Sequence, residues 1–230
     1  MKEFGMRWAF VLAVTAVVVV FSEKMYWYPQ GYAILELILF YAAPVFACLT
    51  AVSYFRVQHL AGMVLVGGVF GVLVEGVLTP VIYEGGLLDP VLPFYFLGWH
   101  GLLAFVFGWH LVRRWLCAGQ WRRLLLASTL VGLLWGVWSL TYWLPEQAEG
   151  FVLAGQWSAF DFGLHAFTFV LLLMGAHWLG EWLLGRGVAP AQFNPTRGEK
   201  WLVSAALGFY FVTLALPAAL AWTLFVVATI

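Results

Sequence analysis

The strongest constraint on the fold of this chain is a series of long apolar stretches joined by short polar links. An α-helix needs roughly 20 apolar residues to cross the hydrocarbon core of a bilayer. The stretches that approach or exceed this length are residues 6–22, 32–54, 59–82, 91–112, 122–144, 157–184 and 201–229. None of them alternates polar and apolar residues as barrel strands do, and only helices and closed barrels satisfy the backbone in lipid. The sequence therefore predicts an all-α integral membrane protein, a bundle of seven transmembrane helices.

The composition supports a membrane protein without a soluble domain. Hydrophobic residues make up 64% of the chain and charged residues 10%, whereas soluble domains are about 45–50% apolar and about 25% charged. The longest links, 145–156 and 185–200, are too short to fold by themselves, so we expect residues 1–230 to form a single transmembrane helical domain. The formal net charge is zero, which does not indicate a nucleic-acid partner, and membrane lipids are the expected partners.

The distribution of basic residues predicts the direction of the helices, because cytoplasmic links are enriched in Lys and Arg. We expect the N-terminus in the cytoplasm and the C-terminus outside, as in a multi-pass protein of the cell (inner) membrane. Every basic residue except Lys24 then lies on the cytoplasmic side: Lys2, Arg7, Arg56, Arg113, Arg114, Arg122, Arg123, Arg186, Arg197 and Lys200. Cys48 and Cys117 also lie toward the cytoplasm and are expected to be free thiols.

Five ionisable residues inside these apolar stretches indicate a buried polar site. A charged side chain at the centre of a bilayer costs at least ~2.5–3.5 kcal/mol on insertion scales, and such residues usually face other helices and have a function. In the expected topology five residues share one slab in the outer half of the membrane: Glu36, Glu75, His100, Asp161 and His165. Asp161 and His165 also share a helix face, and Gly67 and Gly71 form a GxxxG pattern that favours close helix contact.

The residue types in this slab favour a metal-dependent membrane enzyme that acts on a lipid or apolar substrate. Imidazole and carboxylate groups are ligands of divalent transition metals. The expected metal ligands are Glu75, His100, Asp161 and His165. A metal-bound water needs a proton acceptor, and Glu36 or Glu84 would act as this catalytic base near the outer surface. The chain has no HExxH, CxxC or GxSxG motif, so the sequence leaves open whether it is an enzyme.

Three other functions are compatible with the same residues. In a proton- or cation-coupled transporter, the acids and histidines would form a relay. In a haem b electron-transfer subunit, His100 with His165 and His110 with His177 would be the axial ligands. In a structural subunit of a larger membrane complex, the polar residues would contact a partner subunit.

Overall fold

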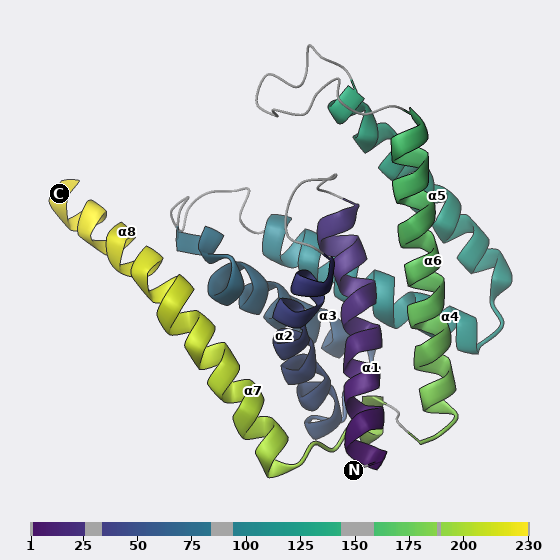
Figure 1. Cartoon of the computed structure of the whole chain (residues 1–230), viewed down its shortest axis with the longest axis horizontal. Coiled ribbons are helices and arrows are strands. Elements are labelled where there is room, and N and C mark those ends of the chain that lie inside the picture. The colour runs from purple at the N-terminus through teal and green to yellow at the C-terminus, as the bar shows by residue number, and fades with distance from the viewer. Residues whose placement is uncertain (1, 26–33, 84–93, 144–158, 188–189, 230) are drawn as a thin grey trace.

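The computed structural model describes residues 2–25, 34–83, 94–143, 159–187 and 190–229, which are almost entirely helical and contain no strand. Helices occupy the described part of each of the seven stretches expected from the sequence. They run alternately up and down in Figure 1, with the N-terminus at the lower end. We call this lower end of the bundle the proximal end, and the opposite end, where residue 25 lies, the distal end.

Eight α-helical segments are joined or extended by shorter elements over the described residues. In chain order they are α1 (Lys2–Val19), η1 (Val20–Lys24), α2 (Ile34–Tyr54), α3 (Leu60–Leu73), η2 (Val74–Leu78), η3 (Pro80–Tyr83), η4 (Phe94–Leu111), α4 (Val112–Cys117), α5 (Trp121–Trp143), α6 (Ala159–Leu184), η6 (Pro190–Gln192), α7 (Arg197–Tyr210), η7 (Phe211–Ala215) and α8 (Leu216–Thr229). The elements η3 and η6 are 3₁₀-helices, and η1, η2, η4 and η7 are π-helical.

Five of the helical spans in the described residues are long and apolar enough to cross a membrane: Glu3–Lys24, Ile34–Tyr54, Leu60–Leu78, Phe160–Leu184 and Arg197–Ala221. The two other stretches expected to cross, 91–112 and 122–144, are helical over η4 with α4 and over α5. The expected helical character is therefore confirmed over the described residues, and five of the seven expected spans are long and apolar enough for a multi-pass arrangement.

The helix α1 lies at the centre of the bundle because its apolar surface extends around the whole helix. From Phe10 to Phe21 every residue except Leu12 is buried, and α2, α6 and η4 pack around it. A helix that is apolar on all sides is typical of a central position. By contrast, α5 and α6 carry many exposed large apolar side chains, such as Leu125 and Phe167. Such surface is typical of helices that face lipid.

Glycines bring α3 and η4 into backbone contact. A Cβ atom added to Gly67 would lie 2.8 Å from the carbonyl oxygen of Gly101, and one added to Gly101 would lie 2.9 Å from the carbonyl oxygen of Gly67. A Cβ added to Gly71 would overlap with the carbonyl group of Phe96. The close contact predicted from the GxxxG pattern is therefore confirmed, because any side chain at these positions would push the two helices apart.

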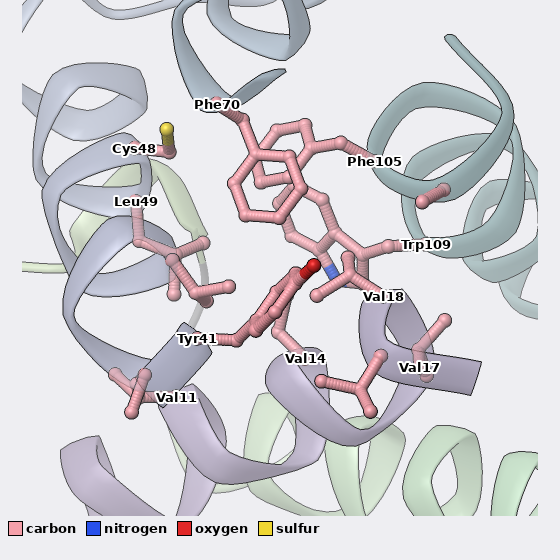
Figure 2. Packing of buried hydrophobic residues seen from close by; sticks show 14 of the residues in the cluster. Val11, Val14, Val17, Val18, Tyr41, Cys48, Leu49, Phe70, Phe105 and Trp109 are labelled. Carbon is pink, nitrogen blue, oxygen red and sulfur yellow. The ribbon is translucent and has the colours of Figure 1, made fainter. Parts of the chain in front are cut away.

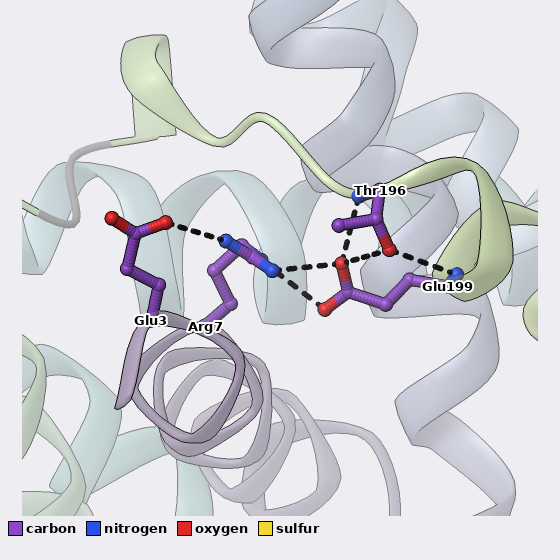
Figure 3. A network of polar contacts seen from close by, with 4 residues as sticks. All are labelled: Glu3, Arg7, Thr196 and Glu199. Atoms are coloured by element: carbon purple, nitrogen blue, oxygen red, sulfur yellow. Dashed lines mark hydrogen bonds and ion pairs between the residues drawn. The ribbon is translucent and has the colours of Figure 1, made fainter. Parts of the chain in front are cut away.

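A buried ion pair attaches α7 to α1 at the proximal end (Figure 3). Arg7 donates from Nε to Glu199 Oε1 at 3.1 Å and from Nη2 to Glu199 Oε2 at 2.9 Å. Glu199 also forms a capping box with Thr196, whose backbone and side chain each donate to the carboxylate. The Glu199 carboxylate therefore caps the N-terminus of α7 and also attaches this helix to the central helix α1.

The last span continues from α7 through η7 to α8 as a slanted rod at the edge of the molecule (Figure 1). The sequence places Pro217 inside this span, where its missing N–H and its ring disturb a regular helix. The π-helical turn η7 ends at Ala215, two residues before this proline. We attribute the π-helical turn to the proline, since both π-turns and proline are common causes of irregularity in long helices.

Candidate functional site

Glu75 and His100 form a buried acid–base pair near the distal end. Glu75 Oε1 lies 2.5 Å from His100 Nε2, and the His100 and Glu75 side chains are only 5% and 9% exposed. The other carboxylate oxygen, Glu75 Oε2, accepts a hydrogen bond of 3.3 Å from the hydroxyl of Thr79. The carboxylate and the imidazole are close enough to share one proton, and the surrounding helices exclude most solvent from them.

A second hydrogen-bonded pair lies beside the first. The Tyr41 hydroxyl donates to the Glu23 carboxylate, and the Tyr41 side chain is fully enclosed by the bundle. The ring centroids of Tyr41 and His100 are 6.3 Å apart with an interplanar angle of 45°. We call Glu23, Tyr41, Glu75, Thr79 and His100 the distal polar cluster.

Irregular backbone positions most of the distal polar cluster. Glu23 lies in η1, Glu75 in η2 and His100 in η4, all of which are π-helical. π-Helical turns occur frequently at functional sites, and in most proteins they are single turns, whereas η4 continues for 18 residues. Tyr41 comes from α2, three residues before Pro44. The close approach of α3 and η4 at their glycines then sets the distance between Glu75 and His100.

Two buried polar atoms beside the pair have no hydrogen-bond partner among the described residues. They are Nδ1 of His100 and Oγ of Ser22. Ser22 precedes Glu23, and its backbone carbonyl accepts a hydrogen bond of 2.9 Å from the indole of Trp99, the neighbour of His100. Buried polar groups are satisfied in the great majority of cases. The unsatisfied imidazole nitrogen is therefore a position where a proton or a ligand would be stabilised.

Aromatic rings close the proximal side of the distal polar cluster. The rings of Phe70 and Phe105 stack with centroids 5.2 Å apart, and Phe105 contacts Trp109 at 4.9 Å. Figure 2 shows these three rings gathered beside Tyr41. Phe70 precedes Glu75 by five residues and Phe105 follows His100 by five, so these two rings lie about one turn toward the proximal end and Trp109 lies about one turn further.

His165 lies in a different contact from the Glu75–His100 pair. Its Nε2 lies 3.0 Å from the backbone carbonyl oxygen of Lys24. Its ring contacts Phe169, with centroids 4.5 Å apart, and Trp135, with centroids 6.1 Å apart. Asp161 lies one turn earlier on α6 and is partly buried. His165 therefore links α6 to η1 and α5.

The four expected metal ligands are only partly brought together. Glu75 pairs with His100, but the described residues contain no group of three or more His, Cys, Asp or Glu side chains arranged to hold a metal ion. The structure thus does not gather Glu75, His100, Asp161 and His165 at one centre. Of the two expected catalytic bases, Glu36 is exposed at the start of α2, contrary to the expectation that it faces other helices, and Glu84 lies outside the described residues.

The remaining histidines of the haem hypothesis lie toward the proximal end. His110 is buried, and its Nε2 has no hydrogen-bond partner in the described part of the chain. His177 is also buried and lies within hydrogen-bonding reach of the Gly108 carbonyl. Neither observation tests haem binding, which stays a prediction.

Sequence reasoning missed Glu23 and Tyr41 as members of the site. Glu23 falls one residue beyond the expected span 6–22 and was therefore assigned to a link. A tyrosine in the middle of an otherwise apolar helix was the available signal for Tyr41, since a buried phenol needs a hydrogen-bond partner. The Thr-x-x-Glu pattern at Thr196 was the available signal for the start of α7, but no local pattern pointed to the contact of Glu199 with Arg7.

Comparison with protein-family models, with curated proteins and with solved structures finds no match to this chain. The chemistry of the described residues is therefore what supports a function.

Proposed function

We propose that this protein is a proton-coupled transporter with seven membrane spans, with its N-terminus in the cytoplasm and its C-terminus outside, in which Glu75 and His100 form the proton-binding site. The observation that carries the proposal is the 2.5 Å contact between these two enclosed side chains. Ionisable residues within membrane spans are costly and characteristically form ion pathways and proton relays.

The pair has the chemistry of a site that exchanges one proton. A carboxylate and an imidazole can share a proton as an ion pair or as a neutral acid and base, and the surroundings decide which form is more stable. Thr79 holds one carboxylate oxygen in place, so the shared proton has a defined position. Tyr41 and Glu23 lie beside the pair, toward the end of η1, and in this proposal they are where protons from the distal end would enter.

Proton binding needs fewer groups than metal binding. A catalytic metal site usually takes three protein ligands and keeps one open position, whereas a proton needs only the two groups that share it. The described residues supply such a pair of groups. Asp161, His165 and Glu36 would have to move toward the pair before a metal-dependent enzyme could be assembled from the expected residues.

The aromatic rings on the proximal side fit one state of an alternating-access cycle. In this state Phe70, Phe105 and Trp109 separate the pair from the proximal end. The pair would then exchange protons only with the distal, outer side. A transporter requires a second state in which these rings separate and the pair opens inward, with the GxxxG contact of α3 and η4 as the moving interface.

Charge displacement on proton binding tests this proposal without knowledge of the substrate. We would reconstitute the protein in vesicles on a solid-supported membrane and apply a rapid acid step. The wild-type protein and the exposed-site control Glu36→Gln should give a transient current, because a proton enters the membrane field when it binds. Glu75→Gln should abolish the current. A current of equal size in Glu75→Gln would place the proton site elsewhere.

One observation favours the metal-dependent enzyme as a second candidate. Metal-binding histidines usually donate their other ring N–H to a carboxylate, and His100 has Nε2 on Glu75 and Nδ1 without a partner among the described residues. A divalent transition metal on His100 would activate water for hydrolysis. Elemental analysis of the purified protein beside His100→Ala tests this candidate: it requires near-stoichiometric metal that the variant loses.

A further inference from the structure

Arg113 carries a buried polar atom that is not satisfied by the described residues. It lies one residue into α4, at the proximal end, and its Nε is enclosed without a hydrogen-bond partner there. Its guanidinium lies 5.6 Å from the centroid of the Trp109 ring. None of the ion pairs found in the described residues includes Arg113. An enclosed donor without a partner loses its hydration without compensation, so an additional group is expected to bind there.

The neighbours of Arg113 favour an anion. His110, three residues earlier, has a buried Nε2 that also has no partner in the described part of the chain. A small cavity borders Arg113; its other lining residues are mostly apolar, such as Phe10 and Val14, and include the imidazole of His177. The nearby carboxylate of Glu181 interacts with Arg113 only from beyond ion-pair distance and contacts the thiol of Cys117.

Further positive charge lies on both sides of the turn that joins α4 to α5. Within eleven residues the chain has four arginines and no acid: Arg113, Arg114, Arg122 and Arg123. The last three are exposed, and Arg113 is half-buried. Trp115 and the exposed Trp121 flank the turn, as expected of side chains at the boundary of a membrane. This is the composition of a surface that contacts anionic lipid at the cytoplasmic leaflet.

We infer that Arg113 anchors the phosphate group of an anionic phospholipid at the proximal end of the bundle. The planar guanidinium binds phosphate through two parallel hydrogen bonds, and basic pockets between transmembrane helices on the cytoplasmic side hold lipid headgroups. Arg114, Arg122 and Arg123 supply the surrounding positive potential. The inference depends on the proposed topology and not on the proton-binding site.

Thermal unfolding of the purified full-length protein in a neutral detergent tests this inference, with phosphatidylglycerol, phosphatidylcholine or inorganic phosphate added. Phosphatidylglycerol should raise the Tm by several degrees, whereas phosphatidylcholine should not. Arg113→Gln should lose this shift, and the matched variant of the exposed neighbour, Arg114→Gln, should keep most of it. Arg113→Lys, which keeps the charge but not the fork, should keep less than half of it.

Arg113→Gln should also unfold no earlier than the wild-type protein when no lipid is added, because the substitution removes a charge without an ion-pair partner among the described residues. Equal lipid shifts in Arg113→Gln and the wild-type protein would overturn the inference, as would equal losses in Arg113→Gln and Arg114→Gln. A shift of the same size with inorganic phosphate would assign the site to a soluble anion instead of a lipid.

Discussion

At the scale of single residues, the two enclosed acid–base pairs found among the described residues differ in how completely their polar atoms are hydrogen-bonded. The Glu199 carboxylate accepts hydrogen bonds from Arg7 and Thr196 at both of its oxygens. The Glu75–His100 pair leaves His100 Nδ1 without a partner in the described residues. A fully satisfied network fixes structure, whereas a partly satisfied one is costly to keep in a low-dielectric interior. Arg7–Glu199 therefore fits a structural role, whereas the incompletely satisfied Glu75–His100 pair fits the proton-binding role that we propose for it.

Replacing Glu199 should strongly destabilise the protein. Glu199→Gln leaves Arg7 charged and half-buried without its carboxylate, and breaking a buried pair in this way typically costs about 3–5 kcal/mol. Glu3→Gln is the matched control, because Glu3 contacts the same arginine at 3.8 Å with a side chain that is 86% exposed. It should change the free energy of unfolding by less than about 1 kcal/mol. Denaturant unfolding in detergent compares the two variants, and equal effects would contradict the structural assignment.

Replacing Glu75 should leave stability nearly unchanged. The amide of Gln can offer its carbonyl oxygen to the Thr79 hydroxyl and its NH2 group to the neutral His100 imidazole, or the reverse, and a neutral side chain is easier to bury than a carboxylate. We expect the free energy of unfolding of Glu75→Gln to lie within about 1 kcal/mol of the wild-type value or above it, as is common when a functional group is removed. A loss as large as that of Glu199→Gln would indicate that Glu75 is a structural residue.

At the scale of helices, the contact between α3 and η4 sets the geometry of the site. The glycines of both elements let the two backbones touch, and the π-helical turns η2 and η4 carry Glu75 and His100 toward each other. In these turns the hydrogen bonds run from i to i+5. A helix face calculated with 3.6 residues per turn is therefore wrong in these segments. This explains why the sequence predicted the depth of the site residues in the membrane better than the direction in which their side chains point.

A methyl group at Gly71 should separate α3 from η4. The new Cβ of Gly71→Ala would overlap with the Phe96 carbonyl group, so we expect a loss of at least about 2 kcal/mol in unfolding free energy, in the range of overpacking, together with loss of the proton-binding current. Gly132→Ala on α5 is the control, because an added Cβ there has no described atom within 4 Å. It should be neutral or stabilising by up to about 1 kcal/mol. Equal stability of the two variants would contradict the contact.

At the scale of the whole molecule, the sequence was sufficient for the helices but not for the site. Apolar length located the five described spans that are long enough to cross a membrane, and depth along the helices placed Glu75 level with His100. The rotation of each helix was not predictable. His165 shares the expected depth but packs against Trp135 and Phe169. Tyr41 and Glu23 meet across two helices, and no local pattern encodes such a pairing.

The two cysteines test the direction of the chain in the membrane. Both are free; Cys48 is buried and Cys117 is exposed near the proximal end. In the proposed topology a membrane-impermeant maleimide should label Cys117 only after cells are permeabilised, and Cys117→Ser should lose the label. Burial raises the pKa of the Cys117 thiol above its ordinary value. The positive charge of Arg113 lowers this pKa, whereas the carboxylate of Glu181 raises it further. Labelling should therefore be slow at neutral pH and accelerate as pH rises. Labelling of Cys117 in intact cells would mean that the proximal end faces outward, which contradicts the proposed orientation.

The most direct test of the central claim is an infrared pH titration of the purified protein, because the claim is that Glu75 and His100 together bind one exchangeable proton. The wild-type protein and the exposed control Glu36→Gln should show a carboxyl stretching band that appears on acidification and shifts in heavy water. Glu75→Gln should lack this band, and His100→Gln should change the pH at which it appears. An unchanged band in Glu75→Gln would mean that the protonated carboxyl group belongs to another residue, and the account of the site would be wrong.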